Sequence, residues 1–297
     1  MQRMMFGNVE VTRVMEGQAP FAPTRTMFPD SRPESWRDNE SWLAPDFWSP
    51  DDDLFVAAMQ TWVLRSEGRT ILVDTGIGRF RPPGAPFDGL LRTSLVDGLA
   101  DVGIKPADVD IVVNTHLHSD HVGWNTSEQD GVLVPTFGRA RYLIPAADNA
   151  ATDPNSPHYV RRSGDTAQRI FGESVLPVHQ AGQAVLWEGS HRIDGNLVLE
   201  AVPGHTPGSS LLRLESAGER AVFVGDILHS PVQIPEPDCN SCFCQDPEQA
   251  RRTRRSVLER AADTGEVVVP AHFGGHGALE VRREGSAFAI SRWAAFS

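Results

Sequence analysis

The stretch His116-Leu117-His118-Ser119-Asp120-His121 places four potential metal ligands within six residues. It follows Asp110-Ile111-Val112-Val113-Asn114, a short apolar run bounded by polar residues, which is typical of a buried parallel strand. Residues two apart at a strand's end point the same way, so His116 and His118 can share one cation. If the chain then turns, Asp120 and His121 can address a second point nearby. Imidazole and carboxylate groups suit zinc and related first-row metals, so this stretch predicts a metal site.

Three more candidate ligands stand where other strands are expected to end. His205 lies in Val202-Pro203-Gly204-His205-Thr206-Pro207-Gly208, a turn after an apolar run. Asp226 follows Phe223-Val224-Gly225, and His272 follows Val269-Pro270-Ala271. In open α/β sheets, ligands gather outside the carboxyl ends of the strands. Each of these residues is therefore placed where it could complete the site.

Taken together, these motifs resemble the metallo-β-lactamase-fold hydrolase superfamily. The 116–121 stretch matches its hallmark His-x-His-x-Asp-His, and the other three motifs match its second histidine, bridging aspartate and last histidine. Asp74-Thr75-Gly76 matches a turn usual in the superfamily. The resemblance spans roughly residues 54–277 in the right order. It implies an α/β fold of four layers, an αββα sandwich of two βα halves, with metals at one edge between the sheets.

The resemblance also implies a role for each residue. One group would hold the first metal, a second group the second metal, Asp226 would bridge them, and Asp74 would orient ligands through hydrogen bonds. The expected cofactors are two zinc ions, although iron, manganese or cobalt accept similar ligands. The first group is His116, His118 and His205, and the second is Asp120, His121 and His272.

The expected activity is hydrolysis of small esters, above all acyl-homoserine-lactone-like lactones, by a hydroxide bridging the metals, with Asp120 relaying a proton. Asp226 in place of a cysteine is similar to lactonase and glyoxalase-type members. The Pro/Trp-rich N-terminal segment and the run at 225–230 resemble the lactonase and methyl-parathion-hydrolase-like branch. A tyrosine that some lactonases use has no match, since Tyr142 and Tyr159 lie outside the motifs.

Other functions stay open beside the lactonase hypothesis. On the same metals, the chain could be a phosphotriesterase or aryl ester hydrolase, or a glyoxalase-II-like thioesterase. A non-catalytic metal-binding scaffold is the alternative outside enzymes, and its expected signature is a missing ligand. The fold alone does not decide, because one scaffold hosts many chemistries.

Weaker signals surround the cluster. Trp124, His229 and Phe273 are candidate substrate-pocket residues, each weighed against ordinary packing. The three cysteines, Cys239, Cys242 and Cys244, are too few for a closed zinc site and do not form a disulfide framework. The basic run Arg251-Arg252-Thr253-Arg254-Arg255 is interpreted as a solvated helix face.

Composition limits the possible partners. The formal net charge is 27 − 39 = −12, which argues against a nucleic-acid surface and against binding to an anionic membrane. No apolar run approaches the ~20 residues of a membrane span, and the N-terminus shows no leader pattern. We expect a cytoplasmic protein acting on a small molecule, with a homodimer possible through the Trp-rich segment.

The organisation expected is a single domain over residues 1–297, in which 15–53 forms an irregular, proline-rich flap. Helices are predicted at 90–102 and 246–264, the latter with Asp246 as its cap and Gly265 as its stop. A closing hairpin is predicted at 278–293. Strands are predicted at 4–14, 54–64, 70–73, 110–114, 141–144, 197–202, 210–214, 221–224 and 267–269.

Overall fold

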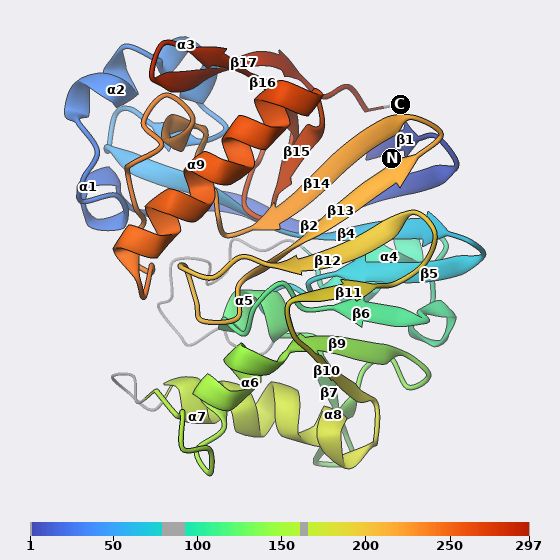
Figure 1. Ribbon diagram of the computed structural model, residues 1–297. Helices are drawn as coiled ribbons and strands as arrows, with labels where there is room; N and C mark the ends of the chain where they lie inside the picture. The colour runs from blue at the N-terminus through green and yellow to red at the C-terminus, as the bar shows by residue number, and fades with distance from the viewer. Residues whose placement is uncertain (1, 79–92, 161–165, 297) are drawn as a thin grey trace.

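The computed structural model describes residues 2–78, 93–160 and 166–296, and it contains two large mixed sheets (Figure 1). The first sheet has the order β1-β2-β4-β5-β6-β9-β10, with β3 paired to β4. The second has the order β11-β12-β13-β14-β15-β16-β17, and β7 and β8 form a separate hairpin. In the first sheet β5, β6, β9 and β10 run parallel, and in the second β14 and β15 do. The carboxyl ends of β5 and β6, and of β14 and β15, therefore each meet at one edge of their sheet.

The first sheet and the small hairpin have the following bounds: β1 Gln2–Phe6, β2 Val9–Pro23, β3 Trp48–Ser49, β4 Leu54–Ser66, β5 Arg69–Val73, β6 Ile111–Val113, β7 Thr126–Gln129, β8 Val132–Pro135, β9 Arg141–Pro145 and β10 Ala184–Trp187. The second sheet comprises β11 Ser190–Arg192, β12 Leu197–Ala201, β13 Ser210–Ser216, β14 Glu219–Gly225, β15 Val267–Pro270, β16 Leu279–Glu284 and β17 Ala287–Trp293.

The α-helices are mostly short, except for one of 18 residues. They are α1 Thr24–Met27, α2 Pro33–Arg37, α3 Glu40–Leu43, α4 Leu95–Asp101, α5 Ser119–Val122, α6 Ala146–Thr152, α7 Thr166–Ile170, α8 Leu176–Gln180 and α9 Pro247–Thr264. A π-helical turn, Phe171–Val175, joins α7 to α8. Among the described residues, no helix has the length and apolar character needed to cross a membrane.

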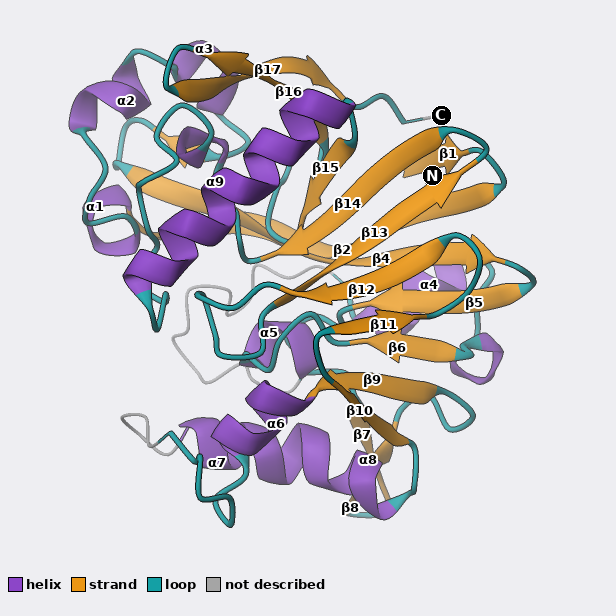
Figure 2. Cartoon of the chain, viewed as in Figure 1, coloured by secondary structure: helices purple, strands orange, loops and turns teal. Residues whose placement is uncertain are grey.

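Alternating side chains build the four layers. On β14, Phe223 packs with Trp62 of β4 in a core between the sheets, while Val222 belongs to a second core with Leu258 of α9. Successive residues of a strand point to opposite faces, so one strand can serve both cores. Helix α9 lies beside β15 and β16 on the second sheet (Figure 2). The expected αββα sandwich is confirmed.

The prediction for residues 15–53 is wrong over its first nine residues. Strand β2 continues to Pro23 between β1 and β4, and Pro20 stands opposite Val56. The register shifts at Met15/Gly17 and Pro20/Ala22 explain this. Proline has no N–H to donate, so a strand tolerates it at a bulge, where the regular hydrogen-bond pattern is interrupted. The rest of the segment consists of short helices, turns and the two-residue strand β3. Within this segment, the indole ring of Trp36 is buried and packs against Phe28 and Trp48.

Other expectations differ in detail. The helix predicted at 90–102 is described only from residue 93 and is helical over Leu95–Asp101; residues 90–92 lie outside the described part of the chain. Helix α9 and the hairpin β16–β17 are confirmed. The solvated face assigned to the basic run is wrong for Arg254, which is 1% exposed. Its guanidinium is satisfied by two carbonyls and a side-chain amide of the 227–240 loop.

Candidate metal centre

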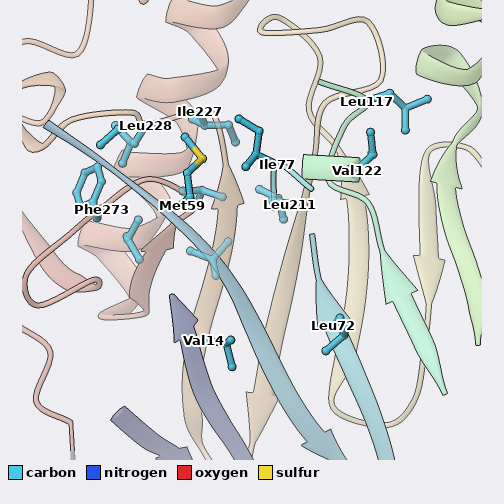
Figure 3. Close-up of a cluster of buried hydrophobic side chains, with 14 of the residues drawn as sticks. Val14, Met59, Leu72, Ile77, Leu117, Val122, Leu211, Ile227, Leu228 and Phe273 are labelled. Atoms are coloured by element: carbon cyan, nitrogen blue, oxygen red, sulfur yellow. The ribbon is translucent and has the colours of Figure 1, made fainter. Parts of the chain in front are cut away.

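The loops that carry the candidate ligands are anchored by their apolar neighbours in the chain. Leu117 and Val122 accompany the 116–121 stretch, Ile227 and Leu228 follow Asp226, and Phe273 follows His272. Figure 3 shows these five side chains in one buried cluster. Packed interiors are dense and resist displacement. The segments that carry the candidate ligands are therefore held by the core, although most of them are loops and only Asp120 and His121 lie in a short helix, α5.

The first group of side chains is brought together at very short range. His116 Nε2 lies 3.0 Å from His118 Nδ1, and His205 Nε2 lies 2.9 Å from the same atom. Asp226 Oδ2 is 3.2 Å from His205 Nε2 and 3.6 Å from His116 Nε2. The ligand atoms of these four residues all lie within 4.8 Å of one another.

The second group lies beside the first. Asp120, His121 and His272 also offer ligand atoms within 4.8 Å of one another. Asp226 Oδ1 is 3.2 Å from His121 Nε2 and 3.1 Å from His272 Nε2. One carboxylate therefore presents one oxygen to each group, as a bridging ligand requires.

Hydrogen bonds fix which ring nitrogen of His121 and of His116 faces the cluster. Asp74 Oδ2 accepts a hydrogen bond from His121 Nδ1 at 2.8 Å, because a carboxylate has no proton to give. The Thr115 hydroxyl donates its single hydrogen to the same carboxylate, at 2.8 Å from Asp74 Oδ2. Its oxygen can therefore only accept a hydrogen bond from His116 Nδ1, at 3.2 Å. In the neutral form of each ring, Nε2 therefore carries a lone pair aimed inward. This is the usual arrangement behind metal-bound histidines.

Two other histidines are oriented from behind in the same way. His272 Nδ1 donates to the Ala58 carbonyl at 3.0 Å. His205 Nδ1 lies 3.8 Å from Cys244 Sγ, which places this cysteine behind the cluster, a position that the sequence did not predict.

The donor set fits cations. His121 Nε2 and Asp226 Oδ1 are buried and lack a hydrogen-bond partner among the described residues, which is costly for polar atoms removed from water. Inward-facing imidazole lone pairs cannot satisfy one another. A divalent ion in each group would satisfy them, and nitrogen and carboxylate ligands are those of zinc and its neighbours.

The charges in the cluster are strongly coupled to Asp226. Burial opposes its ionisation, but the surrounding histidines, with His121 foremost, hold the pKa of Asp226 well below its usual range. Burial also opposes protonation of His205, yet its hydrogen bond with Asp226 raises the pKa of this imidazole to about 9. Burial lowers the pKa of His229 to about 4. Protons on histidines thus balance a buried carboxylate, and bound cations would replace them.

The three candidate pocket residues lie in different environments. His229 is buried, with Nε2 3.1 Å from Asp226 Oδ2, and so joins the cluster. Trp124 is partly buried, and its Nε1 donates to Glu16 Oε1 at 2.8 Å, so it braces the loop after His121. Phe273 is wrong as a pocket residue: it is fully buried, edge-on to Phe47, because the chain turns into the core after His272.

The tyrosine question is settled for Tyr142. Its hydroxyl donates to the Asn125 carbonyl at 3.0 Å and accepts from Phe137 N at 3.1 Å. The ring is fully buried within β9. It is a structural residue of the first sheet and does not face the cluster.

Comparison with known proteins supports these assignments at the level of the family. The model of the Metallo-beta-lactamase superfamily matches residues 58–272, a span that includes all seven candidate ligands. Metallo-beta-lactamase domain-containing protein 1 of Xenopus laevis is 27% identical over 211 residues, covering 68% of this chain and 66% of the relative. N-acyl homoserine lactonase AiiB of Agrobacterium fabrum is 28% identical over 142 residues, covering 41% of this chain and 48% of the relative. The chain thus spans about half to two thirds of the length of these curated relatives.

Solved structures show the same architecture over the whole chain. The structure described as AidC, a dizinc quorum-quenching lactonase in complex with a product, superposes with a TM-score of 0.82 at 19% identity. The superposition covers 100% of this chain and 98% of that one. At this identity the likeness establishes the shared fold, and the chemistry must be argued from the residues.

Proposed function

Since the chain belongs to the metallo-beta-lactamase superfamily, we propose that it is a dinuclear-metal hydrolase that opens small cyclic esters of the N-acyl homoserine lactone class. One observation carries the proposal: seven side chains from both sheets form two adjacent ligand groups, and Asp226 faces both. The lactonase names of AiiB and AidC support the substrate class. Zinc is the metal we propose.

When bound, two such cations would lower the pKa of a water molecule toward about 7 and polarise a substrate carbonyl. The protein's own contribution is orientation. Asp74, Thr115 and the Ala58 carbonyl hold three imidazoles with their lone pairs inward. Such preorganisation removes the cost of arranging the groups during the reaction.

Asp120 is the group we propose for proton transfer. Its side chain is 26% exposed, against 1–6% for the histidines His121 and His272 beside it. It is thus the carboxylate of the second group that solvent and a substrate can reach. A carboxylate placed there can hold a proton and pass it to the alkoxide that leaves when the lactone ring opens.

His229 is proposed as a contact for a substrate oxygen. Its Nδ1 is buried and has no hydrogen-bond partner among the described residues. Its ring stacks with that of His272 at 5.8 Å and 23°. The ring is neutral and its Nε2 donates toward the Asp226 carboxylate, so Nδ1 is left to accept a hydrogen bond from a protonated substrate oxygen, such as the hydroxyl formed when the lactone ring opens.

The test is a comparison of substrates on the zinc-loaded protein. The value of kcat/KM is measured for N-hexanoyl homoserine lactone, an aryl ester, a paraoxon-type triester and a thioester. Turnover fastest on the lactone supports the proposal. Strong triester, aryl ester or thioester turnover without lactone turnover would assign the site to that class instead. An Asp110→Asn variant, altered at the opposite end of β6, is the control for purification and folding.

A further inference from the structure

Asp148 is a buried carboxylate with no part in the ligand groups. It stands on α6, directly after β9, and its residue is 2% exposed. It accepts three hydrogen bonds from two distant segments. Leu117 N donates to Oδ2 at 2.9 Å, Thr206 Oγ1 donates to Oδ2 at 2.9 Å, and Gly208 N donates to Oδ1 at 2.6 Å.

The donors flank three of the candidate ligands. Leu117 separates His116 from His118, and Thr206 directly follows His205. These are the three histidines of the first group. The Asp148 carboxylate thus bonds to both loops, 116–118 and 205–208, that would have to meet around the first cation.

The approach of the second loop is close. A Cβ added to Gly208 would lie 2.6 Å from Asp148 N and 2.8 Å from Asp148 Oδ1, so only glycine fits there. All three partners are donors, and an ionised carboxylate accepts through both oxygens. An asparagine at this place would turn its NH₂ group toward at least one donor.

We propose that Asp148 is the positioning residue of the first metal group, setting the distance between the 116–118 and 205–208 loops and thereby its affinity for a cation. This inference rests on the proposed metal site but not on the substrate. The second group is oriented by other atoms, with His121 held by Asp74 and His272 by the Ala58 carbonyl. Loss of the Asp148 carboxylate should therefore weaken one site and spare the other.

The experiment isolates each site before testing Asp148. His272→Ala disables the second group and His205→Ala disables the first. Zinc affinity is measured by chelator competition in both backgrounds, with and without Asp148→Asn. We expect a loss of about 10–100-fold in the His272→Ala background, the size typical of removing a partner behind a ligand. In the His205→Ala background we expect a change below about threefold on the same scale.

Two controls separate positioning from general stability. Asp110→Asn removes a carboxylate that accepts a backbone hydrogen bond from Thr70 at 2.9 Å, remote from the ligands, and should leave both affinities unchanged. If Asp148→Asn fails to fold, Thr206→Val removes only one of the three bonds and should weaken the first site to a smaller degree. Equal loss at both sites, or no loss at either, would overturn the inference. A wild-type protein that binds no zinc would instead refute the proposed function.

Discussion

His121 Nδ1 lies 2.8 Å from Asp74 Oδ2, although 47 positions separate the two residues. The same carboxylate also accepts from the Thr115 backbone and hydroxyl. Asp74 thus orients the candidate ligand His121 directly and the candidate ligand His116 through Thr115. The pair links the end of β5 to the loop after β6.

Asp74→Asn should weaken metal binding. The amide can no longer accept from all its present donors, so the tautomers of His121 and His116 lose their constraint. We expect zinc affinity to fall by about 10–100-fold, measured by chelator competition. Asp194→Asn is the matched control, because it alters another buried carboxylate, in a turn where Oδ1 accepts from Asn196 N. An Asp74→Asn protein with wild-type affinity would contradict the orienting role.

Asp226→Asn should abolish the dinuclear site. This carboxylate lies within 3.1–3.6 Å of five imidazoles, and an amide neither bridges cations nor balances their charge. We expect fewer than two zinc ions per chain by elemental analysis. Hydrolysis should fall by about a thousand-fold or more, since metal catalysis supplies several kcal/mol. Retention of two ions would show that Asp226 is not shared.

Removing metal should lower thermal stability. Ligands that bind only the folded chain stabilise it by about 2.7 kcal/mol at a hundred times the dissociation constant. For a chain of 297 residues, at about 2.1 cal/mol/K of unfolding entropy per residue, that corresponds to roughly 4 °C in Tm. Calorimetry before and after chelation, followed by zinc addition, measures the shift. An unchanged Tm in protein shown to have lost its metal would argue against a site formed only on folding.

Arg254→Met should be strongly destabilising. The buried guanidinium donates hydrogen bonds to the Ile227 and Pro237 carbonyls and to the Asn240 side chain, and the substitution leaves these acceptors without a donor. We expect the free energy of unfolding to fall by about 2–5 kcal/mol. Arg252→Met, on the same helix but 63% exposed, should change it by less than about 0.5 kcal/mol. Urea denaturation of both variants decides, and equal effects would contradict the burial argument.

The cysteines should differ in reactivity. Burial raises the pKa of the Cys239 thiol to about 12, so at pH 8 only about one molecule in ten thousand carries the thiolate there. Cys242 is exposed. Iodoacetamide should therefore label Cys242 before Cys239, and faster as the pH rises from 7 to 9, whereas Cys239 should react only on unfolding. Peptide mass spectrometry follows both sites, and early labelling of Cys239 would contradict this.

The candidate ligands could be proposed from sequence because each of their segments follows an apolar run at a strand's end. His116, His205 and Asp226 need no knowledge of distant partners to be recognised as candidates. Asp148 and Arg254 carry no such local signal. Asp148 bonds residues 31 to 60 positions away, and Arg254 lies in a basic run whose other arginines are exposed or only partly buried. Only tertiary packing distinguishes them.

The prediction that residues 15–23 are irregular is wrong for a related reason. Proline at position 20 argues against a central strand, and the register shifts that accommodate it depend on pairing with β4 more than thirty residues later. Phe273 is not a pocket residue because the chain turns into the core directly after His272, so closeness in sequence to a candidate ligand does not bring a side chain to the substrate.

The two ligand groups draw on loops of both sheets, beginning at His116 and ending only with His272. During synthesis, the four candidate ligands of residues 116–121 leave the ribosome before the three that follow strands of the second sheet, so each group is incomplete at first. A cation bound early would therefore be held loosely and exchange freely. His272 reaches the second ligand group only after β15 has joined the second sheet. Tight metal binding would therefore be a late step of folding in the cell.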